Sequence, residues 1–127
     1  MDILLDSHAV IWFFDNDPRL SKSAIEAISN LDNTIYVSIA SVWEVGIKYS
    51  TGKLTLNKGI DGFIETICDN DFNLLEVSSE HIKEVTKLPF IHRDPFDRML
   101  IAQAKIEGMT ILTVDENIVK YDINTVW

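Results

Sequence analysis

The sequence DPFDRMLIAQAKIEGMTILTVD, residues 94–115, decides the fold class of this 127-residue chain. Asp94 is a preferred N-terminal cap and Pro95 suits the first position of a helix, so we expect a helix to begin there. Gly108 is the residue type that most often follows the last turn of a helix, and it ends this one. The next run, residues 110–114, has the β-branched and apolar side chains of a buried strand. A helix that leads directly into a buried strand is typical of an α/β protein.

The rest of the chain repeats this alternation of short apolar strands with amphipathic helices. We expect strands at residues 2–5, 34–38, 74–77 and 110–114, with a last extended piece at 123–127. We expect helices at residues 8–14, from the cap Ser21 onward, at 40–50, 60–69, 82–88 and 95–107, and a short one at 116–120. Such alternation predicts a mostly parallel sheet with right-handed crossovers and helices on both faces. No repeat, linker or low-complexity segment interrupts it, so we expect one domain over residues 1–127.

The composition is that of a globular protein. Apolar residues make up 46% and charged residues 24%, which excludes a disordered chain. No apolar run reaches the roughly 20 residues that a membrane span requires, and no basic leader precedes the first apolar stretch. We therefore expect neither a membrane segment nor a signal peptide. The single Cys68 excludes an internal disulfide and a cysteine-rich zinc site, which favours a cytoplasmic location.

The charge balance is strongly acidic, with 11 Lys and Arg residues, 20 Asp and Glu residues and a net charge of −9. This balance excludes an overall attraction to nucleic acids or anionic membranes, so a nucleic acid would need a local basic patch. The partners that an acidic protein attracts by default are metal ions and basic polypeptides.

Two acidic residues directly follow two of the predicted strands. Asp6 comes after residues 2–5, and Asp115 comes after residues 110–114. In an open α/β sheet the ligand-binding crevice lies beyond the carboxyl ends of the strands, so both side chains are candidates for one site. Either residue could instead cap the helix that follows it, because Asp is a preferred N-cap.

Three further carboxylates belong to predicted helices or their caps. Glu44 lies among apolar residues, although Lys48 four positions later offers an exposed ion pair as the alternative. Asp97 lies in the first turn of its helix, and the apolar residues on the same face point it inward. Asp94 is expected mainly as the cap of that helix, with a metal-binding role as the alternative.

Such carboxylates would repel one another if they converged on one crevice. Two like charges about 4 Å apart repel by about 4 kcal/mol at an effective dielectric of 20. Oxygen ligands without Cys or His favour Mg²⁺ or Mn²⁺ over zinc, and such an ion promotes hydrolysis of a phosphodiester. The glycines match no phosphate-binding loop, and His8, His81 and His92 lack the spacing of zinc ligands.

Four segments of the chain, in this order, resemble the PIN-domain family: Asp6-Ser7-His8-Ala9 after a first strand, Ser41-Val42-Trp43-Glu44 in a helix, His92-Arg93-Asp94-Pro95-Phe96-Asp97-Arg98, and Leu112-Thr113-Val114-Asp115. More narrowly, they resemble the VapC-type toxins of bacterial toxin–antitoxin pairs. The likeness spans nearly the whole chain, and the segment at 92–98 is its most specific part.

The resemblance implies a Mg²⁺- or Mn²⁺-dependent ribonuclease on a five-stranded parallel sheet flanked by helices. It also implies a homodimer that a cognate antitoxin silences. The acidic quartet of the family falls on Asp6, Glu44, Asp97 and Asp115. Asp94 is a candidate fifth member, and Thr113 matches a polar position beside the last acid.

The acidity of the chain departs from what RNA cleavage suggests. The basic residues that flank the proposed acids are therefore expected to form a local rim for the substrate: Lys48, Lys53, Arg93 and Arg98.

Other functions remain open. A phospho-acceptor receiver domain has a similar length and also binds Mg²⁺, but it needs paired acids after the first strand and a late Lys. Asp6 is single, and residues 110–115 contain no Lys. A haloacid-dehalogenase-like phosphatase needs a second Asp where His8 stands. A catalytically silent PIN-like binding module also remains, and an activity assay separates it from an enzyme.

Overall fold

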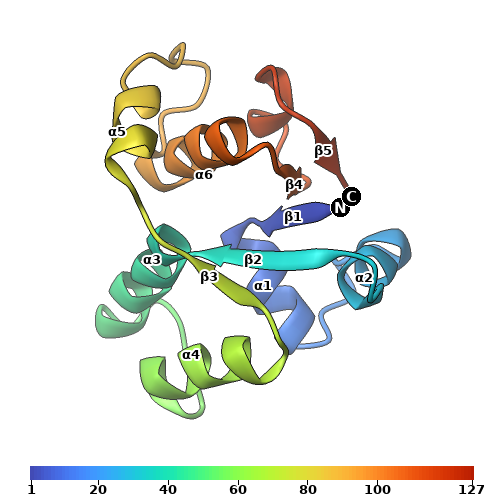
Figure 1. The fold of residues 1–127 in the computed structure, drawn as a ribbon. Coiled ribbons are helices and arrows are strands. Elements are labelled where there is room, and N and C mark those ends of the chain that lie inside the picture. The colour runs from blue at the N-terminus through green and yellow to red at the C-terminus, as the bar shows by residue number, and fades with distance from the viewer.

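The centre of the structure is a five-stranded sheet in which every neighbouring pair of strands is parallel (Figure 1). The computed structural model describes all 127 residues. The strands are β1 (Asp2–Leu5), β2 (Thr34–Ser38), β3 (Asn73–Leu75), β4 (Thr110–Leu112) and β5 (Thr125–Val126). Their order across the sheet is β3-β2-β1-β4-β5, so the first strand of the chain lies in the middle. The predicted α/β class with a five-stranded parallel sheet is confirmed.

Helices cover both faces of this sheet. They are α1 (Ser7–Phe14), α2 (Lys22–Ser29), α3 (Ile39–Ser50), α4 (Gly59–Asp69), α5 (Ser79–Val85), α6 (Pro95–Glu107) and the 3-10 helix η1 (Ile118–Lys120). Alternate residues of a strand face opposite sides, so Ile3 and Leu5 pack in one apolar cluster and Leu4 in another. Figure 1 shows α1–α4 on one side of the sheet and α5 and α6 on the other. No helix is both long and apolar enough to cross a membrane.

Most predicted elements are present with small shifts at their ends. The helix α6 has the predicted bounds, and Gly108 beyond it has φ 68°, a left-handed conformation that glycine adopts without strain. The strand β4 ends at Leu112 rather than at residue 114. The helix α5 begins three residues before its predicted start, because the Ser78 side chain accepts the backbone N–H of His81 and caps it there.

The topology brings several polar segments to one edge of the sheet. The central strands β1 and β4 are parallel neighbours, so the residues that follow them lie side by side. The helix α6 precedes β4 and runs back along the sheet, which places its N-terminus near the same edge (Figure 1). The helix α3 begins where β2 ends. These chain ends carry the acidic residues of the predicted site.

Candidate active site

Asp6 lies at the carboxyl end of β1, and its side chain is fixed from two sides. Its Oδ1 accepts the backbone N–H of Ala9 at 2.8 Å, so it caps α1. Its Oδ2 accepts the hydroxyl of Thr113, which follows β4. The residue is only 6% exposed, and this burial raises the pKa of Asp6, while the two hydrogen bonds act in the opposite direction. Capping and membership of the acidic cluster are thus both features of this residue.

Asp115 lies across from Asp6, at the end of the segment that leaves β4. Its Oδ1 accepts the backbone N–H groups of Asn117 at 2.8 Å and Ile118 at 3.3 Å. Its Oδ2 lies 3.1 Å from His92 Nε2. Partial burial alone would raise the pKa of Asp115, but the hydrogen bonds from His92, Asn117 and Ile118 lower it below its usual range.

Asp94 and Asp97 occupy the first turn of α6. Asp94 Oδ1 accepts the backbone N–H groups of Phe96 at 2.8 Å and Asp97 at 3.2 Å, so the predicted capping role is present. Asp97 Oδ2 lies 3.1 Å from His92 Nε2. Burial first, and the neighbouring charge of Asp94 second, raise the pKa of Asp97 to about 7, and His92 opposes this shift. A pKa that high marks a carboxylate with too little positive charge around it.

Glu44 completes the acidic group from α3. It is 8% exposed, its Oε1 accepts the Ser7 hydroxyl at 2.7 Å, and its Oε2 lies 3.3 Å from Lys48 Nζ. The predicted ion pair with Lys48 therefore exists, but it involves a buried carboxylate. Glu44 also faces Asp97 closely enough that its charge contributes to the raised pKa of Asp97.

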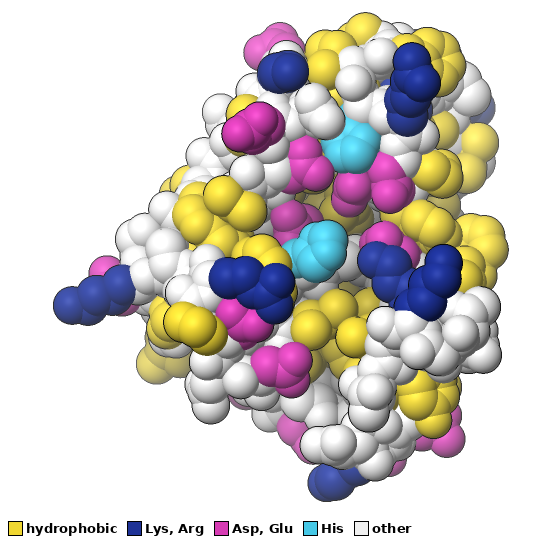
Figure 2. All heavy atoms as spheres, turned by 180° about the vertical axis from the view of Figure 1, so that it is seen from behind, with side chains coloured by type: hydrophobic (Ala, Val, Ile, Leu, Met, Phe, Trp, Pro, Cys, Tyr) yellow, Lys and Arg dark blue, Asp and Glu magenta, His cyan; other side chains and the backbone are white.

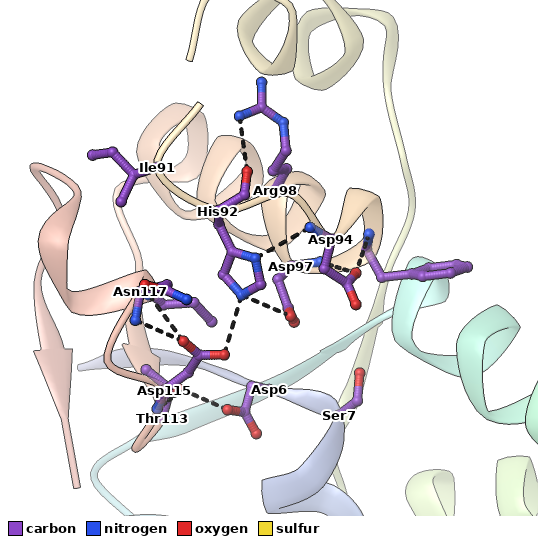
Figure 3. Close-up of polar contacts among 12 residues, drawn as sticks. Asp6, Ser7, Ile91, His92, Asp94, Asp97, Arg98, Thr113, Asp115 and Asn117 are labelled. Atoms are coloured by element: carbon purple, nitrogen blue, oxygen red, sulfur yellow. Dashed lines mark hydrogen bonds and ion pairs between the residues drawn. The ribbon is translucent and has the colours of Figure 1, made fainter. Parts of the chain in front are cut away.

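His92 is the residue of this site that the sequence reasoning missed. Figure 3 shows its ring between the carboxylates of Asp97 and Asp115. Ligand atoms of these three residues all lie within 4.8 Å of one another. Two signals in the sequence pointed to it: His92 opens the segment 92–98 that is most specific in the resemblance, and it lies two residues before the cap Asp94, beside the N-terminus of α6.

Of the four basic residues expected at the rim, three reach the surface and Arg98 is buried. Lys53 and Arg93 are exposed and Lys48 is half-buried. Lys48 and Lys53, together with Glu44 and Asp94, line a hollow of about 280 Å³. Figure 2 shows the molecule from behind the view of Figure 1. On this face, acidic side chains gather around histidine in a hollow, and Lys and Arg side chains lie around the hollow.

Arg98 corrects the expected basic rim. Arg98 is only 7% exposed, and its guanidinium donates hydrogen bonds to the carbonyls of Val85 at 3.0 Å, Leu88 at 3.3 Å and Pro89 at 2.9 Å. These contacts use the charge inside the protein, because Leu88 and Pro89 lie in the loop before α6 and Val85 ends α5, where helical hydrogen bonding of the carbonyls stops. Arg98 therefore anchors this loop rather than facing a substrate.

The chain is similar to proteins of one family over nearly its whole length. The family model for the PIN domain matches residues 3–124, while no curated protein matches the chain. VapBC2 from Rickettsia felis, bound to a DNA fragment from their promoter, has a TM-score of 0.78 at 14% identity, covering 100% of this chain and 99% of that chain. A DNA-bound VapBC from Salmonella typhimurium has a TM-score of 0.72 at 14% identity, with 99% and 97% covered. A toxin–antitoxin complex from Klebsiella pneumoniae has a TM-score of 0.68 at 17% identity, with 98% and 96% covered. At these identities, the similarity to the solved structures is one of fold.

Proposed function

Because the chain belongs to the PIN domain family, we propose that it is a metal-dependent nuclease that cleaves RNA as the toxin of a toxin–antitoxin pair. The observation that carries this proposal is the meeting of Asp6, Asp97 and Asp115 at one edge of the sheet, with Glu44 facing Asp97. Nuclease activity agrees with the family, and the toxin role agrees with the structural likeness to toxin–antitoxin complexes. We expect the enzyme to act in the cytoplasm.

The donor set fits a hard divalent cation. The converging groups are carboxylates with the His92 imidazole beside them and no thiol, and the excess of carboxylate oxygens favours Mg²⁺ or Mn²⁺. The raised pKa of Asp97 supports the same conclusion, because it reflects a buried carboxylate near other acids that lacks a sufficient positive charge. Asp6, Asp97 and Asp115 would hold the ion, with Glu44 completing the set. When bound, it would supply Lewis acidity that polarises a phosphoryl oxygen and activates water.

The surrounding side chains hold these acids in place. The Thr113 hydroxyl donates to Asp6 Oδ2, and its own Oγ1 accepts the backbone N–H of Asp115 at 3.0 Å, so the Thr113 side chain ties two acidic residues together. The Ser7 hydroxyl orients Glu44 in the same way. Asp94 fixes the first turn of α6 as its cap, and we assign it that supporting role rather than a place among the ligands.

The substrate is proposed to be RNA, bound at the hollow beside Glu44. Lys48 and Lys53 line this hollow, and the exposed Arg93 directly precedes Asp94, another of its lining residues, so we propose these three to contact phosphate oxygens. They are few against a net charge of −9, so the binding of RNA should be sensitive to salt and should depend on the cation that neutralises the acids.

Two protein partners complete the proposal, a cognate antitoxin and a second copy of the chain. An apolar groove of about 720 Å³ runs between α3, α5 and α6 and is lined by residues that include Ile82, Phe96 and Met99. Trp43 stands at this groove 65% exposed and packs its ring against Phe96 at 5.3 Å between centroids. In a dimer with a two-fold axis, the same patch of each copy faces the other. The exposed Trp43 ring of one copy can then enter the apolar groove of its partner and the reverse, which supports pairing through this face. Sedimentation of the wild type and Trp43→Ser tests this: a dimer that persists in the variant contradicts the assignment.

The function is tested by incubating the purified protein with total RNA and either Mg²⁺ or Mn²⁺. We expect cleavage that EDTA and Asp6→Asn abolish, because both remove the cation. Asp2→Asn is the matched control, since Asp2 is the exposed residue at the other end of β1. Activity in Asp6→Asn at the wild-type level would overturn the proposal, and a wild type without cleavage would favour a silent binding module.

A further inference from the structure

His92 is held in one orientation by groups on both sides of its ring. Its Nδ1 accepts the backbone N–H of Asp94 at 3.2 Å. Its Nε2 lies 3.1 Å from Asp115 Oδ2 and 3.1 Å from Asp97 Oδ2, with hydrogen-bond geometry toward Asp115 (Figure 3). The side chain is 11% exposed, so solvent has little access to the ring.

The partner at Nδ1 determines where the ring proton lies. A backbone amide can only donate, so Nδ1 must accept and carries no proton. A neutral imidazole then has its single proton on Nε2, where it points between two carboxylates. His92 thus presents an N–H group at the place where Asp97 and Asp115 come closest.

The same partner argues against His92 as a metal ligand. A neutral histidine that binds a metal through Nε2 carries its proton on Nδ1 and donates it to an acceptor. Here Nδ1 faces a donor, the backbone N–H of Asp94. If Nε2 bound the ion, the proton on Nδ1 would point at that N–H, and two donors would face each other. The ring would have to leave its place before it could coordinate an ion.

The loop that carries His92 is also fixed. The backbone N–H of His92 donates to Tyr121 Oη at 2.9 Å, and Tyr121 Oη donates to the carbonyl of Pro89 at 2.7 Å. The guanidinium of Arg98 donates to the same Pro89 carbonyl and to the carbonyls of Val85, at the end of α5, and Leu88. The position of the imidazole is therefore set by its own loop and does not depend on the carboxylates it touches.

We propose that His92 is a positioning residue that holds Asp115 against Asp97 through its Nε2–H and does not itself bind the metal ion. This inference rests on the proposed metal-dependent function. Asp115 and Asp97 come from different elements, the segment after β4 and the helix α6, and their like charges push them apart. The Nε2–H opposes that repulsion before any ion binds.

His81 is a natural control within the same chain. Its Nδ1 accepts the backbone N–H of Ser78 at 3.0 Å, and its Nε2 lies 3.2 Å from Glu107 Oε1, so its local arrangement copies that of His92. It is buried between α5 and α6 and contacts none of the clustered acids. Replacing His81 should lower stability without changing metal affinity.

The test measures Mn²⁺ affinity of the full-length protein by titration calorimetry at pH 8. We expect His92→Ala to bind Mn²⁺ about 10–100-fold more weakly, the usual effect of losing a group that orients a ligand. His92→Gln, which keeps an N–H donor, should recover most of the loss. His81→Ala should bind Mn²⁺ like the wild type.

Two spectroscopic readouts on the wild type separate positioning from ligation, and they hold even if His92→Ala fails to fold. The ¹⁵N spectrum of His92 should show an unprotonated Nδ1 and a protonated Nε2, both without metal and with saturating Mg²⁺. Pulsed EPR of bound Mn²⁺ should show no directly coordinated imidazole nitrogen.

Three results would overturn the inference while leaving the proposed nuclease intact. These are unchanged Mn²⁺ affinity in His92→Ala, tighter binding in that variant, which would make the imidazole a competitor of the ion, and a coordinated nitrogen in the EPR spectrum. A wild-type protein that does not bind Mn²⁺ would overturn both this inference and the metal dependence of the proposed function.

Discussion

Replacing Asp97 by Asn should stabilise the metal-free protein, although it removes a candidate metal ligand. Burial and the charge of Asp94 raise the pKa of Asp97 to about 7 in the folded chain, from an ordinary value of 3.8. Between these two values the folded state holds a proton that the unfolded state has lost. The stability of the wild type must therefore fall as the pH rises from about 4 to about 7, and change no further from this group above pH 7.

The size of the effect follows from the shift. A difference of about 3 pKa units corresponds to about 4 kcal/mol at 1.36 kcal/mol per unit. The side chain of Asp97 is 19% exposed, so water screens part of this, and we expect a gain of about 2–4 kcal/mol for Asp97→Asn at pH 8. At pH 4 the two proteins should differ little, because the carboxyl is protonated in the folded wild type.

The assay is urea unfolding in EDTA across pH 4–8. Asp61→Asn is the matched control, because Asp61 occupies the same third position of α4 but is exposed. The Asp61→Asn variant loses a favourable charge near a helix N-terminus, so its free energy of unfolding should fall by up to about 1 kcal/mol. Adding Mn²⁺ at about 100 times its Kd should stabilise the wild type by about 2.7 kcal/mol and Asp97→Asn by far less. Parallel stability curves for the wild type and Asp97→Asn from pH 4 to 8 would refute the reasoning.

Three further variants test the groups around the acids. Thr113→Val removes the donor to Asp6 and should cost about 1–3 kcal/mol in urea unfolding and weaken Mn²⁺ binding; unchanged affinity would contradict its orienting role. Asp94→Asn should leave the melting temperature nearly unchanged, because Asn caps as well as Asp, and should reduce cleavage only in part. Complete loss of cleavage would instead make Asp94 a ligand. Arg98→Lys should destabilise the protein by about 2 kcal/mol or more and speed amide hydrogen exchange in the loop before α6, because a lysine cannot reproduce the forked contacts. Normal exchange in that loop would show that the anchor lies elsewhere.

The parts of the fold that the sequence predicted well are those with strong local signals at both ends. Pro95 and Gly108 bracket α6 and gave its bounds, and the short β-rich run at 34–38 is β2. The helix α5 was placed too late, because the apolar spacing continues to Leu88 after the helix has ended at Val85. Leu88 is buried even so. Leu88 is buried because the loop packs against other elements. A helical spacing of apolar residues cannot tell such a buried loop residue from a residue inside a helix.

The grouping of the acids was predictable for a topological reason. Parallel neighbours bring their carboxyl ends to one edge, so residues such as Asp6 and Asp115, 109 positions apart, become neighbours once β1 and β4 pair. Their roles in catalysis remain predictions. The contact between the Ser7 hydroxyl and Glu44 was not predictable, because it depends on how α1 packs against α3.

Arg98 and His92 were misjudged for one shared reason. From its charge alone, an arginine beside carboxylates is expected to bind a phosphate of the substrate. From its spacing alone, a single histidine is not recognised as part of a site. What decides both is the irregular loop before α6, whose carbonyls at Leu88, Pro89 and His92 accept hydrogen bonds from Arg98 and whose fixed path carries His92 to the acids. Backbone acceptors are not encoded by residue type, so a sequence cannot reveal them.

The segment 92–98 works as one unit: Asp94 caps the helix and sets the tautomer of His92 with its N–H, while Arg98 holds the loop. Substitutions at these positions should therefore be coupled rather than additive, and a double-mutant cycle between Arg98 and His92 on Mn²⁺ affinity would measure that coupling.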